Sequence, residues 1–246
     1  MLAVLMYHDV VHGGGKYAND PEVLRAHLEY VRRNHPVVLP GDPLTSGELS
    51  ACLTFDDAHV GFFHFVYPML REMGLRAMVA VSTNFILEDT AVPMEQRLGT
   101  SSRNGREGAH FQDTACFCTW KELREMQAGG VVEVACHSAG HVDLTRSGID
   151  LEREIHGAGR KIAEHLETFP QTFVFPLGRV NPSVARVTKR FYPYCMRIGG
   201  ALNRGWRNPG GLIYRLQGDG LQDERGPLRD LWKPRLRYYW NTLRLR

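Results

Sequence analysis

The feature that most constrains this chain is a short apolar strand that runs directly into two adjacent carboxylates. Residues 51–55 (Ala-Cys-Leu-Thr-Phe) are rich in strand formers, and Asp56 and Asp57 follow them at once. Two neighbouring anions repel each other, and burying either one costs free energy unless a cation or proton compensates for its charge. Packing gives no reason for such a sequence, whereas a bound metal ion would supply the compensation. The pattern therefore predicts further metal ligands elsewhere in the chain.

The candidate ligands are two histidines four residues apart, His137 and His141, which follow a strand predicted over residues 131–136. On a helical turn, positions i and i+4 share one face, so both imidazole rings can reach one ion. Two imidazoles and one carboxylate form a three-ligand set that leaves a coordination position open, as in catalytic metal sites. This donor set suits zinc, and it also admits cobalt, nickel or iron.

Neighbouring residues of a strand point in opposite directions, so only one carboxylate of the Asp56–Asp57 pair need bind the ion and complete that ligand set. The other can act as a general base on a water activated by the ion. A leaving amine or alcohol also needs a general acid, for which a histidine with an unperturbed pKa of about 6.5 is suited. The residues alone leave open which aspartate takes which role.

A His-x-x-x-His pair by itself is a weak signal, because two ordinary surface or strand-end histidines look the same. The metal hypothesis gains strength from position: His8, Asp56–Asp57 and His137 all lie at the carboxyl end of a predicted strand. In barrels of alternating strands and helices, the chemistry is found at those ends. The sequence therefore predicts that these residues share one site.

Strand and helix patterns alternate along the chain, which favours one parallel, barrel-like α/β domain over residues 1–246. Strands are predicted at residues 3–10, 37–39, 51–55, 77–81, 131–136, 172–175, 194–198 and 213–216. Helices are predicted to begin after Asp20, at 66, after Thr119, at 150 and after Asn181. No internal repeat or break in composition marks a linker between domains.

Composition excludes several classes of protein. The 246 residues include 43% hydrophobic ones, enough for a sizeable core, and the net charge of +3 is too small to indicate nucleic acid as a partner. No apolar run of eighteen residues is present, and the N-terminal stretch lacks the pattern of a signal peptide. Five cysteines, an odd number, favour reduced thiols over a disulfide framework. These features favour a cytoplasmic protein.

Two motifs resemble those of a known family. Thr54-Phe-Asp-Asp-Ala58 is similar to the Thr-Phe-Asp-Asp-Gly motif of the polysaccharide deacetylases, the NodB-homology or family 4 carbohydrate esterases. His137-Ser-Ala-Gly-His141 resembles their second motif, His-Ser-x-x-His. The resemblance extends from about residue 1 to about residue 220, and it implies a single distorted (β/α) barrel of about seven parallel strands. It also implies that Asp56 is the catalytic base and that Asp57, His137 and His141 hold the metal.

The same resemblance assigns two further catalytic groups. The segment from Met6 to Val10 resembles the opening of the circularly permuted branch that deacetylates poly-N-acetylglucosamine, in which the acid histidine lies at the start of the domain. His8 is then the general acid. Leu216-Gln-Gly-Asp219, where the common order would place this residue, contains no histidine. Phe175-Pro-Leu-Gly178 is similar to the third motif, whose backbone N–H groups bind the oxyanion, so Leu177 is the expected donor.

The chain departs from the family pattern at two places. Ala58 replaces the glycine of the first motif, which would strain the backbone if this position requires a positive φ. The arginine that often begins the third motif and orients the base is absent, and Arg179 or Arg215 would have to replace it.

Other polar residues are weaker candidates. Asp9, His59 and Arg179 are predicted to contact the substrate, although packing behind the site is the more ordinary role for His59. Cys116, Cys118 and Cys136 are expected to be reduced thiols, because they lack the spacing of a second metal site. These assignments depend on proximity in sequence alone.

Residues 88–113 show no periodicity and are predicted to form a surface or lid loop. Arg97, Arg103 and Arg106 within it would cap an anionic or glycan substrate, and a solvent-exposed loop explains the composition equally well. The tail, residues 222–246, mixes aromatic residues with Arg and Lys. It is expected either to dock on the domain as a terminal helix or to make peripheral contact with an anionic membrane.

The resemblance implies a metal-dependent hydrolase that removes the acetyl group of an N-acetylated sugar. Its expected substrate is a glycan or an intracellular precursor of O-antigen, lipopolysaccharide or another surface polysaccharide, in the cytoplasm or at the inner face of the membrane. Two alternatives stay open: a related hydrolase of formyl amides or O-acetyl esters, and a catalytically silent, metal-containing glycan-binding domain. The presence of acid and base candidates argues against the silent domain, because a binding module needs neither.

Overall fold

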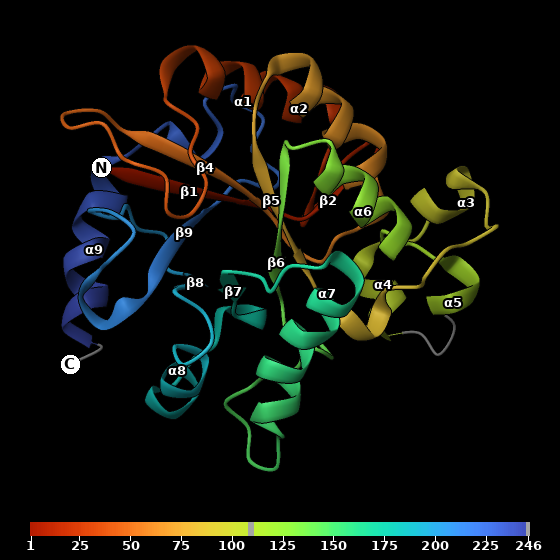
Figure 1. The fold of residues 1–246 in the computed structure, drawn as a ribbon. Coiled ribbons are helices and arrows are strands. Elements are labelled where there is room, and N and C mark those ends of the chain that lie inside the picture. Colours follow the sequence, from red (N-terminus) through yellow and green to blue (C-terminus); the bar gives the residue numbers. More distant parts are fainter. Residues whose placement is uncertain (108–110, 245–246) are drawn as a thin grey trace.

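A computed structural model of the chain describes residues 1–107 and 111–244. Parallel strands close into a seven-stranded barrel in the order β1-β4-β5-β6-β7-β8-β9, with helices around it (Figure 1). The strands are β1 (Leu2–Tyr7), β4 (Ser50–Phe55), β5 (Ala77–Val81), β6 (Val132–Cys136), β7 (Thr172–Val174), β8 (Tyr194–Ile198) and β9 (Ile213–Gln217). Pairing of β1 with β9 closes the barrel. The predicted parallel α/β barrel of about seven strands is confirmed.

Alternation along the strands directs side chains into two cores. Leu2 and Val4 of β1 pack with Cys52 of β4 inside the barrel, whereas Ala3 and Leu5 pack against the outer helices. Successive side chains of a strand point to opposite faces. The same alternation turns Val4 and Cys52 inward, and it continues just beyond each strand. It therefore directs the side chains of His8 and Asp56 into the open end of the barrel.

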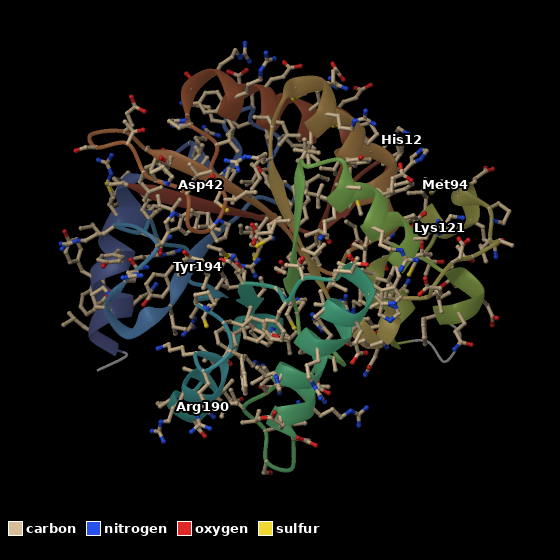
Figure 2. The ribbon with its side chains drawn as sticks, viewed as in Figure 1. His12, Asp42, Met94, Lys121, Arg190 and Tyr194 are labelled. Carbon is tan, nitrogen blue, oxygen red and sulfur yellow. The ribbon has the colours of Figure 1, made fainter. Side chains whose placement is uncertain are left out.

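Helices cover the outside of the barrel and begin at their expected caps. The helices are α1 (Pro21–Asn34), α2 (Tyr67–Met73), α6 (Trp120–Ala128), α7 (Ala158–Leu166) and α8 (Pro182–Thr188). Asp20 accepts a hydrogen bond from Glu22 N at the start of α1, and Asn181 caps α8. Charged side chains such as Lys121 of α6 and Arg190 after α8 project outward from these helices (Figure 2).

The structure differs from the sequence prediction at two strands. Val37 forms only an isolated bridge with Ala51, so the strand predicted at 37–39 does not form. The strand predicted at 3–10 is interrupted at His8, after which β2 (Asp9–Val10) pairs with β3 (Ala18–Asn19) outside the barrel. The interruption turns the chain away from the barrel and leaves His8 at its carboxyl end.

Residues 88–113, which lack a periodic pattern, and the tail, for which a docked terminal helix is one expectation, both contain helices. Residues 88–113 include α3 (Met94–Leu98), α4 (Ser102–Glu107) and α5 (Phe111–Thr114), apart from positions 108–110, which lie outside the described residues. The tail forms α9 (Trp232–Arg244), on the outside of the barrel (Figure 1). Among the described residues, no helix has the length and apolar character needed to cross a bilayer.

Candidate metal centre

A cavity of about 990 Å³ lies at the carboxyl end of the barrel and brings together most of the predicted site residues. Residues from five strand ends line it: His8, Asp56, Asp57, His137, His141, Leu177 and Arg215. The segment that carries α4 forms another wall, and residues 14–18 of the loop before β3 form the rim. The predicted clustering at strand ends is therefore observed.

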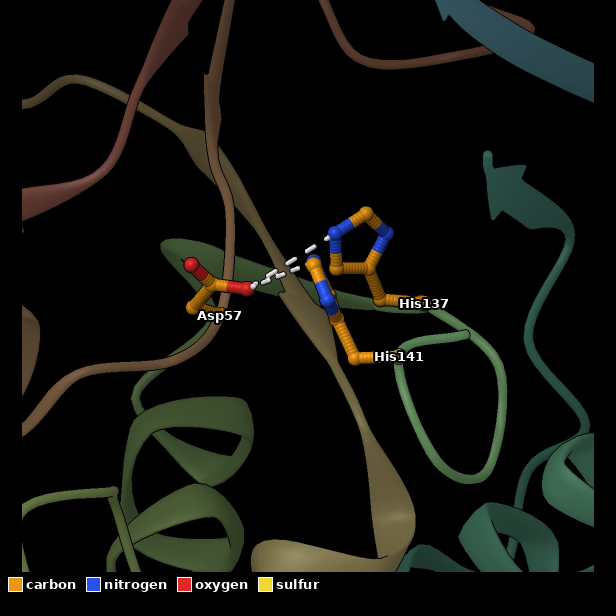
Figure 3. A group of neighbouring side chains, drawn as sticks. All are labelled: Asp57, His137 and His141. Atoms are coloured by element: carbon orange, nitrogen blue, oxygen red, sulfur yellow. Dashed lines mark ion pairs between the residues drawn. The ribbon is translucent and has the colours of Figure 1, made fainter. Parts of the chain in front are cut away.

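Asp57, His137 and His141 converge on one point within this cavity (Figure 3). Asp57 Oδ1 lies 3.7 Å from His137 Nε2 and 3.4 Å from His141 Nε2. A tetrahedral ion about 2.0–2.1 Å from each ligand atom would separate those atoms by about 3.3–3.4 Å. The spacing of the three groups therefore fits a divalent ion such as zinc with little rearrangement.

The protonation of these groups also suits a metal. His137 Nδ1 lies 2.8 Å from the carbonyl oxygen of Val174, which can only accept, so this nitrogen donates. Burial lowers the pKa of His137, which favours the neutral ring, in which Nε2 presents its lone pair. Burial, reinforced by His137, lowers the pKa of His141 to about 3, so its ring is neutral. Asp57 Oδ1 is buried and has no hydrogen-bond partner. Two neutral imidazoles and one ionised carboxylate are the state that a metal ion requires.

A cation from the segment 88–113 faces the same carboxylate. Arg106 Nη1 of α4 lies 2.6 Å from Asp57 Oδ1, in an ion pair that is not aligned as a hydrogen bond. Burial favours the neutral acid, but the charge of the Arg106 guanidinium opposes it, and the pKa of Asp57 lies below its usual range. Sequence reasoning placed Arg106 against the substrate and missed its contact with the ligand set.

The other two arginines of this segment do not reach the metal ligands. Arg97 is buried and paired with Glu122 of α6, and it donates to the carbonyl groups of Ala115 and Phe117. Arg103 pairs with Glu107 on the exposed side of α4. Arg97 therefore ties the segment to α6. Arg103 and Arg106 both line the cavity, and of these two it is Arg106 that contacts Asp57.

The backbone around the metal ligands adopts left-handed conformations. Asp57, Ala58, Ser138 and His141 have φ values of 71°, 53°, 67° and 51°. Such conformations in non-glycine residues cost about 1–2 kcal/mol each, and they cluster at functional sites. The strain expected at Ala58 is present, because this position does take the positive φ that a glycine would adopt without cost.

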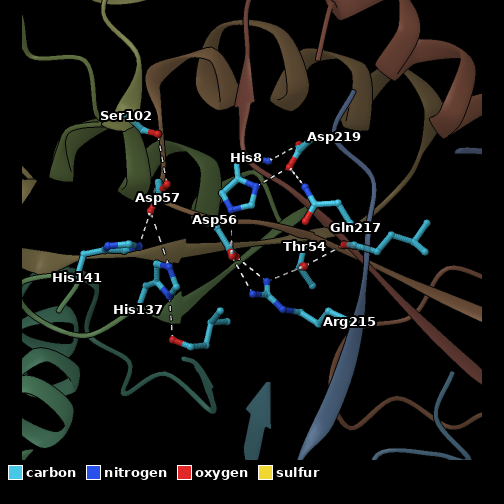
Figure 4. Close-up of polar contacts among 12 residues, drawn as sticks. His8, Thr54, Asp56, Asp57, Ser102, His137, His141, Arg215, Gln217 and Asp219 are labelled. Atoms are coloured by element: carbon cyan, nitrogen blue, oxygen red, sulfur yellow. Dashed lines mark hydrogen bonds and ion pairs between the residues drawn. The ribbon is translucent and has the colours of Figure 1, made fainter. Parts of the chain in front are cut away.

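Asp56 forms a bidentate ion pair with Arg215 of β9 (Figure 4). Arg215 Nη1 and Nη2 donate to Asp56 Oδ1 and Oδ2 at 2.6 and 2.8 Å, and both side chains are buried. Burial tends to raise the pKa of Asp56, but the Arg215 charge, aided by His137, lowers it to about 2. Of the two arginines considered as replacements for the missing one, Arg215 contacts Asp56, and Arg179 pairs with Asp143 instead.

His8 lies across the cavity from Asp56, with Nε2 3.8 Å from Asp56 Oδ2. Its Nδ1 lies 2.6 Å from Asp219 Oδ2, and its backbone N–H donates to Asp219 Oδ1. Burial alone would lower the pKa of His8, but Asp219 and Asp56 outweigh it and raise the pKa to about 9. His8 is therefore an imidazolium at neutral pH, oriented by an aspartate that sequence reasoning did not identify.

The remaining candidates occupy different positions. His59 is 1% exposed, its Nδ1 accepts from Gly61 N–H and its Nε2 lies 3.0 Å from the carbonyl oxygen of Thr100, so it organises the backbone outside the cavity. Asp9 lines the cavity, but its Oδ2 accepts from Ser102 N–H. Arg179 lies at the rim and pairs with Asp143. Leu177 also lines the cavity, 52% exposed with a φ of 58°.

The cysteines are free and buried. Burial raises the pKa of Cys116 to about 11, which disfavours the thiolate that a metal would bind. Cys136 packs in the outer core beneath β6 rather than in the barrel. The expectation of inert thiols agrees with these environments.

Zinc is expected to raise the unfolding temperature of the protein through the three ligands. A ligand that binds only the folded state adds about 2.7 kcal/mol to the free energy of unfolding at roughly a hundredfold excess over Kd. His141→Ala removes one ligand and should abolish most of the shift, measured by thermal unfolding with and without zinc. His64→Ala replaces an exposed histidine and should keep the shift. An unfolding temperature that zinc leaves unchanged in the unaltered chain would contradict the assignment.

Comparisons with known proteins give a family match and several fold matches. A family model described as polysaccharide deacetylase matches residues 45–192. No curated protein matches the chain. Several solved structures share the fold at sequence identities below 20%.

The Streptococcus pyogenes deacetylase PplD, in complex with acetate, is 17% identical with a TM-score of 0.69, covering 91% of this chain and 94% of that one. IcaB from Ammonifex degensii is 19% identical with a TM-score of 0.67, covering 87% and 90%. The polysaccharide deacetylase BC0361 from Bacillus cereus is 18% identical with a TM-score of 0.70, covering 88% of this chain. This chain spans 64% of the length of BC0361 and of a related Bacillus anthracis structure.

Proposed function

This chain belongs to the polysaccharide deacetylase family, and we propose that it hydrolyses the N-acetyl group of an amino sugar in a glycan or glycan precursor. One observation carries the proposal. An ionised carboxylate, Asp56, and an imidazolium, His8, face each other at 3.8 Å beside a three-ligand metal site. Amide hydrolysis needs both a base for the attacking water and an acid for the leaving nitrogen, and the cavity offers one of each.

Asp57, His137 and His141 would hold the ion, which when bound polarises the amide carbonyl and makes water a stronger nucleophile. Asp56 accepts a proton from the attacking water, and Arg215 keeps this carboxylate ionised and fixed in orientation. His8 Nε2 then donates its proton to the departing nitrogen as the C–N bond breaks. The products of water and the amide are acetate and a free amine. Leu177, at the cavity rim, is the proposed N–H donor to the oxyanion.

The substrate is proposed to be a lipid-linked or nucleotide-linked sugar on the way to a surface polysaccharide, inside the cell. A cavity of about 990 Å³ lies at the upper end of the range for ligand pockets, which leaves room for a sugar and part of its carrier. Mass spectrometry of candidate glycan precursors after incubation with the protein would identify the product. A loss of one acetyl group from a precursor supports this substrate class, and its absence from every intracellular precursor contradicts it.

Hydrolysis of a formyl amide or an O-acetyl ester would use the same groups, so substrate trials must separate these reactions. Release of acetate from N-acetyl sugars, of formate from N-formyl sugars and of acetate from O-acetyl sugars should be compared in zinc and in chelator. We expect zinc-dependent release of acetate from N-acetyl sugars to be the fastest of the three reactions. A silent glycan-binding domain would release nothing, and its Asp56→Asn variant would bind glycan as tightly as the unaltered protein.

The rate of hydrolysis is expected to fall as the pH rises through about 9. The folded-state pKa of His8 is raised to about 9, so the proton that it donates is present below that pH and is lost above it. Asp219→Asn weakens the interaction that raises this pKa and should move the fall in kcat/KM to lower pH, toward about 6.5. Asp223→Asn, which alters a carboxylate paired with Arg225 outside the cavity, should leave the profile unchanged. A pH profile that Asp219→Asn does not move would show that His8 is not the acid.

A further inference from the structure

Helix α9 presents an apolar face to solvent. Trp232, Leu236, Tyr239, Trp240 and Leu243 are 61%, 55%, 54%, 65% and 62% exposed. At about 100° per residue, these five positions fall within an arc of about 100°, so they form one continuous stripe along the helix. A stripe of this kind usually faces a core or a partner, and none of the described residues covers it.

The opposite face of α9 fixes how the stripe points. Tyr238 is 6% exposed and packs with Ala201 and Tyr214 of β9. Leu202 N–H donates to the carbonyl group of Pro234, and Asn241 Nδ2 donates to that of Gly199. Because both halves of the helix are held on the barrel, the exposed stripe faces away from it. Helix α9 itself lies at the edge of the molecule (Figure 1).

Basic residues flank the stripe on both sides. Arg235 lies along one edge, and Lys233 and Arg237 along the other, all exposed. Residues 231–246 contain five Lys or Arg and no Asp or Glu. Arg204 adds a further cation, stacked over Tyr239. A second copy of the same face would bring these like charges together, so self-association is disfavoured, whereas an anionic surface complements them.

We propose that this face of α9 docks the protein on an anionic lipid surface. Tryptophan and tyrosine rings favour the headgroup region of a bilayer, where an apolar body and a polar edge are both satisfied. Arg and Lys beside them are attracted to lipid phosphates, as in helices that lie in the plane of a membrane. With 13 residues, α9 is suited to lie on the bilayer and too short to cross it.

Docking would also orient the cavity. Asn241 bonds Gly199, which directly follows Ile198 on the cavity wall. The C-terminal half of α9 therefore lies next to the β8 side of the cavity rim and would bring that side close to the headgroups. A lipid-linked substrate could then enter the cavity from the membrane. This implication rests on the proposed function, whereas the proposal of docking does not depend on it.

The test is co-sedimentation of the whole protein with phosphatidylcholine vesicles and with vesicles that also contain phosphatidylglycerol. Binding is expected only to the anionic vesicles, with a blue shift of tryptophan emission and release at high salt. Trp232→Ser with Trp240→Ser should reduce the bound fraction at least about tenfold. Arg235→Glu with Arg237→Glu should do the same by reversing the charge.

Matched controls are Leu221→Ser, at an exposed apolar residue outside α9, and Arg160→Glu, on the exposed side of α7. Both controls should bind vesicles like the unaltered protein. Acetate release from a water-soluble N-acetyl sugar should be the same in all these variants, so failure of docking and failure of the proposed hydrolysis can be told apart. Absence of binding to anionic vesicles by the folded protein overturns the proposal. So does sedimentation analysis that shows a dimer dissociated by the α9 substitutions.

Discussion

Asp56→Asn is expected to lower kcat for acetate release by about 10²–10⁴-fold, the usual contribution of a general base. Asparagine has nearly the same shape as aspartate and can still accept a hydrogen bond from Arg215, but it cannot take a proton from water. Zinc binding by Asp57, His137 and His141 should persist, because within the described part of the chain Asp56 forms no hydrogen bond or ion pair with any of these three residues. Steady-state kinetics and calorimetric zinc titration on the same preparation check both expectations.

The matched control is Asp42→Asn, which also removes the charge of an aspartate paired with an arginine. Asp42 pairs with Arg76, which directly precedes β5 and therefore lies at the amino end of the strands, opposite to the cavity. This variant should hydrolyse substrate at close to the unaltered rate. If Asp56→Asn kept its full rate while loaded with zinc, the base would have to be another group, and the proposed mechanism would be wrong.

Arg215→Met is expected to lower the free energy of unfolding by about 3–5 kcal/mol at neutral pH, the usual cost of removing one partner of a buried ion pair. Arg215 and Asp56 are 1% and 3% exposed, so water has little access to the space between them and solvates the carboxylate poorly once the guanidinium is removed. Methionine fills similar space without charge, which leaves the buried carboxylate without its bidentate partner and with only the His8 imidazolium, 3.8 Å away, opposite its charge. Urea unfolding of both proteins measures the difference. Activity should fall as well, since the base loses the group that orients it.

Two further measurements make this prediction specific. Adding Asp56→Asn to Arg215→Met removes the buried charge and should recover much of the lost stability. The deficit of the single variant should also shrink in acid. In the unaltered protein the pKa of Asp56 is lowered to about 2, so the Asp56–Arg215 ion pair stabilises the fold fully above about pH 4. This stabilisation is lost as the pH falls toward 2. Arg25→Met, at an exposed pair with Glu72, should change stability little.

Much of the site was predictable because strand ends determine where side chains meet. A buried apolar run before Asp56 and another before His137 place both at the carboxyl end of parallel strands. In a closed barrel all such ends surround one opening, so the metal ligands could be grouped without knowledge of the register. The family motifs then assigned roles that the residues alone left open.

The groups that set charge in the site were harder to predict. Arg215 reaches Asp56 because β9 pairs with β1 in the register that places Arg215 beside Val4. No local sequence pattern encodes that pairing. Asp219 reaches His8 through the same pairing. Arg106 lies in a segment without periodicity, whose short helices depend on tertiary contacts such as the buried pair of Arg97 with Glu122. Sequence patterns describe elements well and contacts between distant elements poorly.

The closing pair of strands implies an order in which the site assembles. The metal ligands come together once β4, β5 and β6 are paired, whereas the counter-charges of Asp56 and His8 both arrive with β9. His8 and Asp219 are 211 positions apart in the chain, and contacts of such separation close the largest loops and form slowly. A folding intermediate without β9 would thus be able to capture metal before it could move a proton. Enzymatic competence would then appear only with the last step of barrel closure.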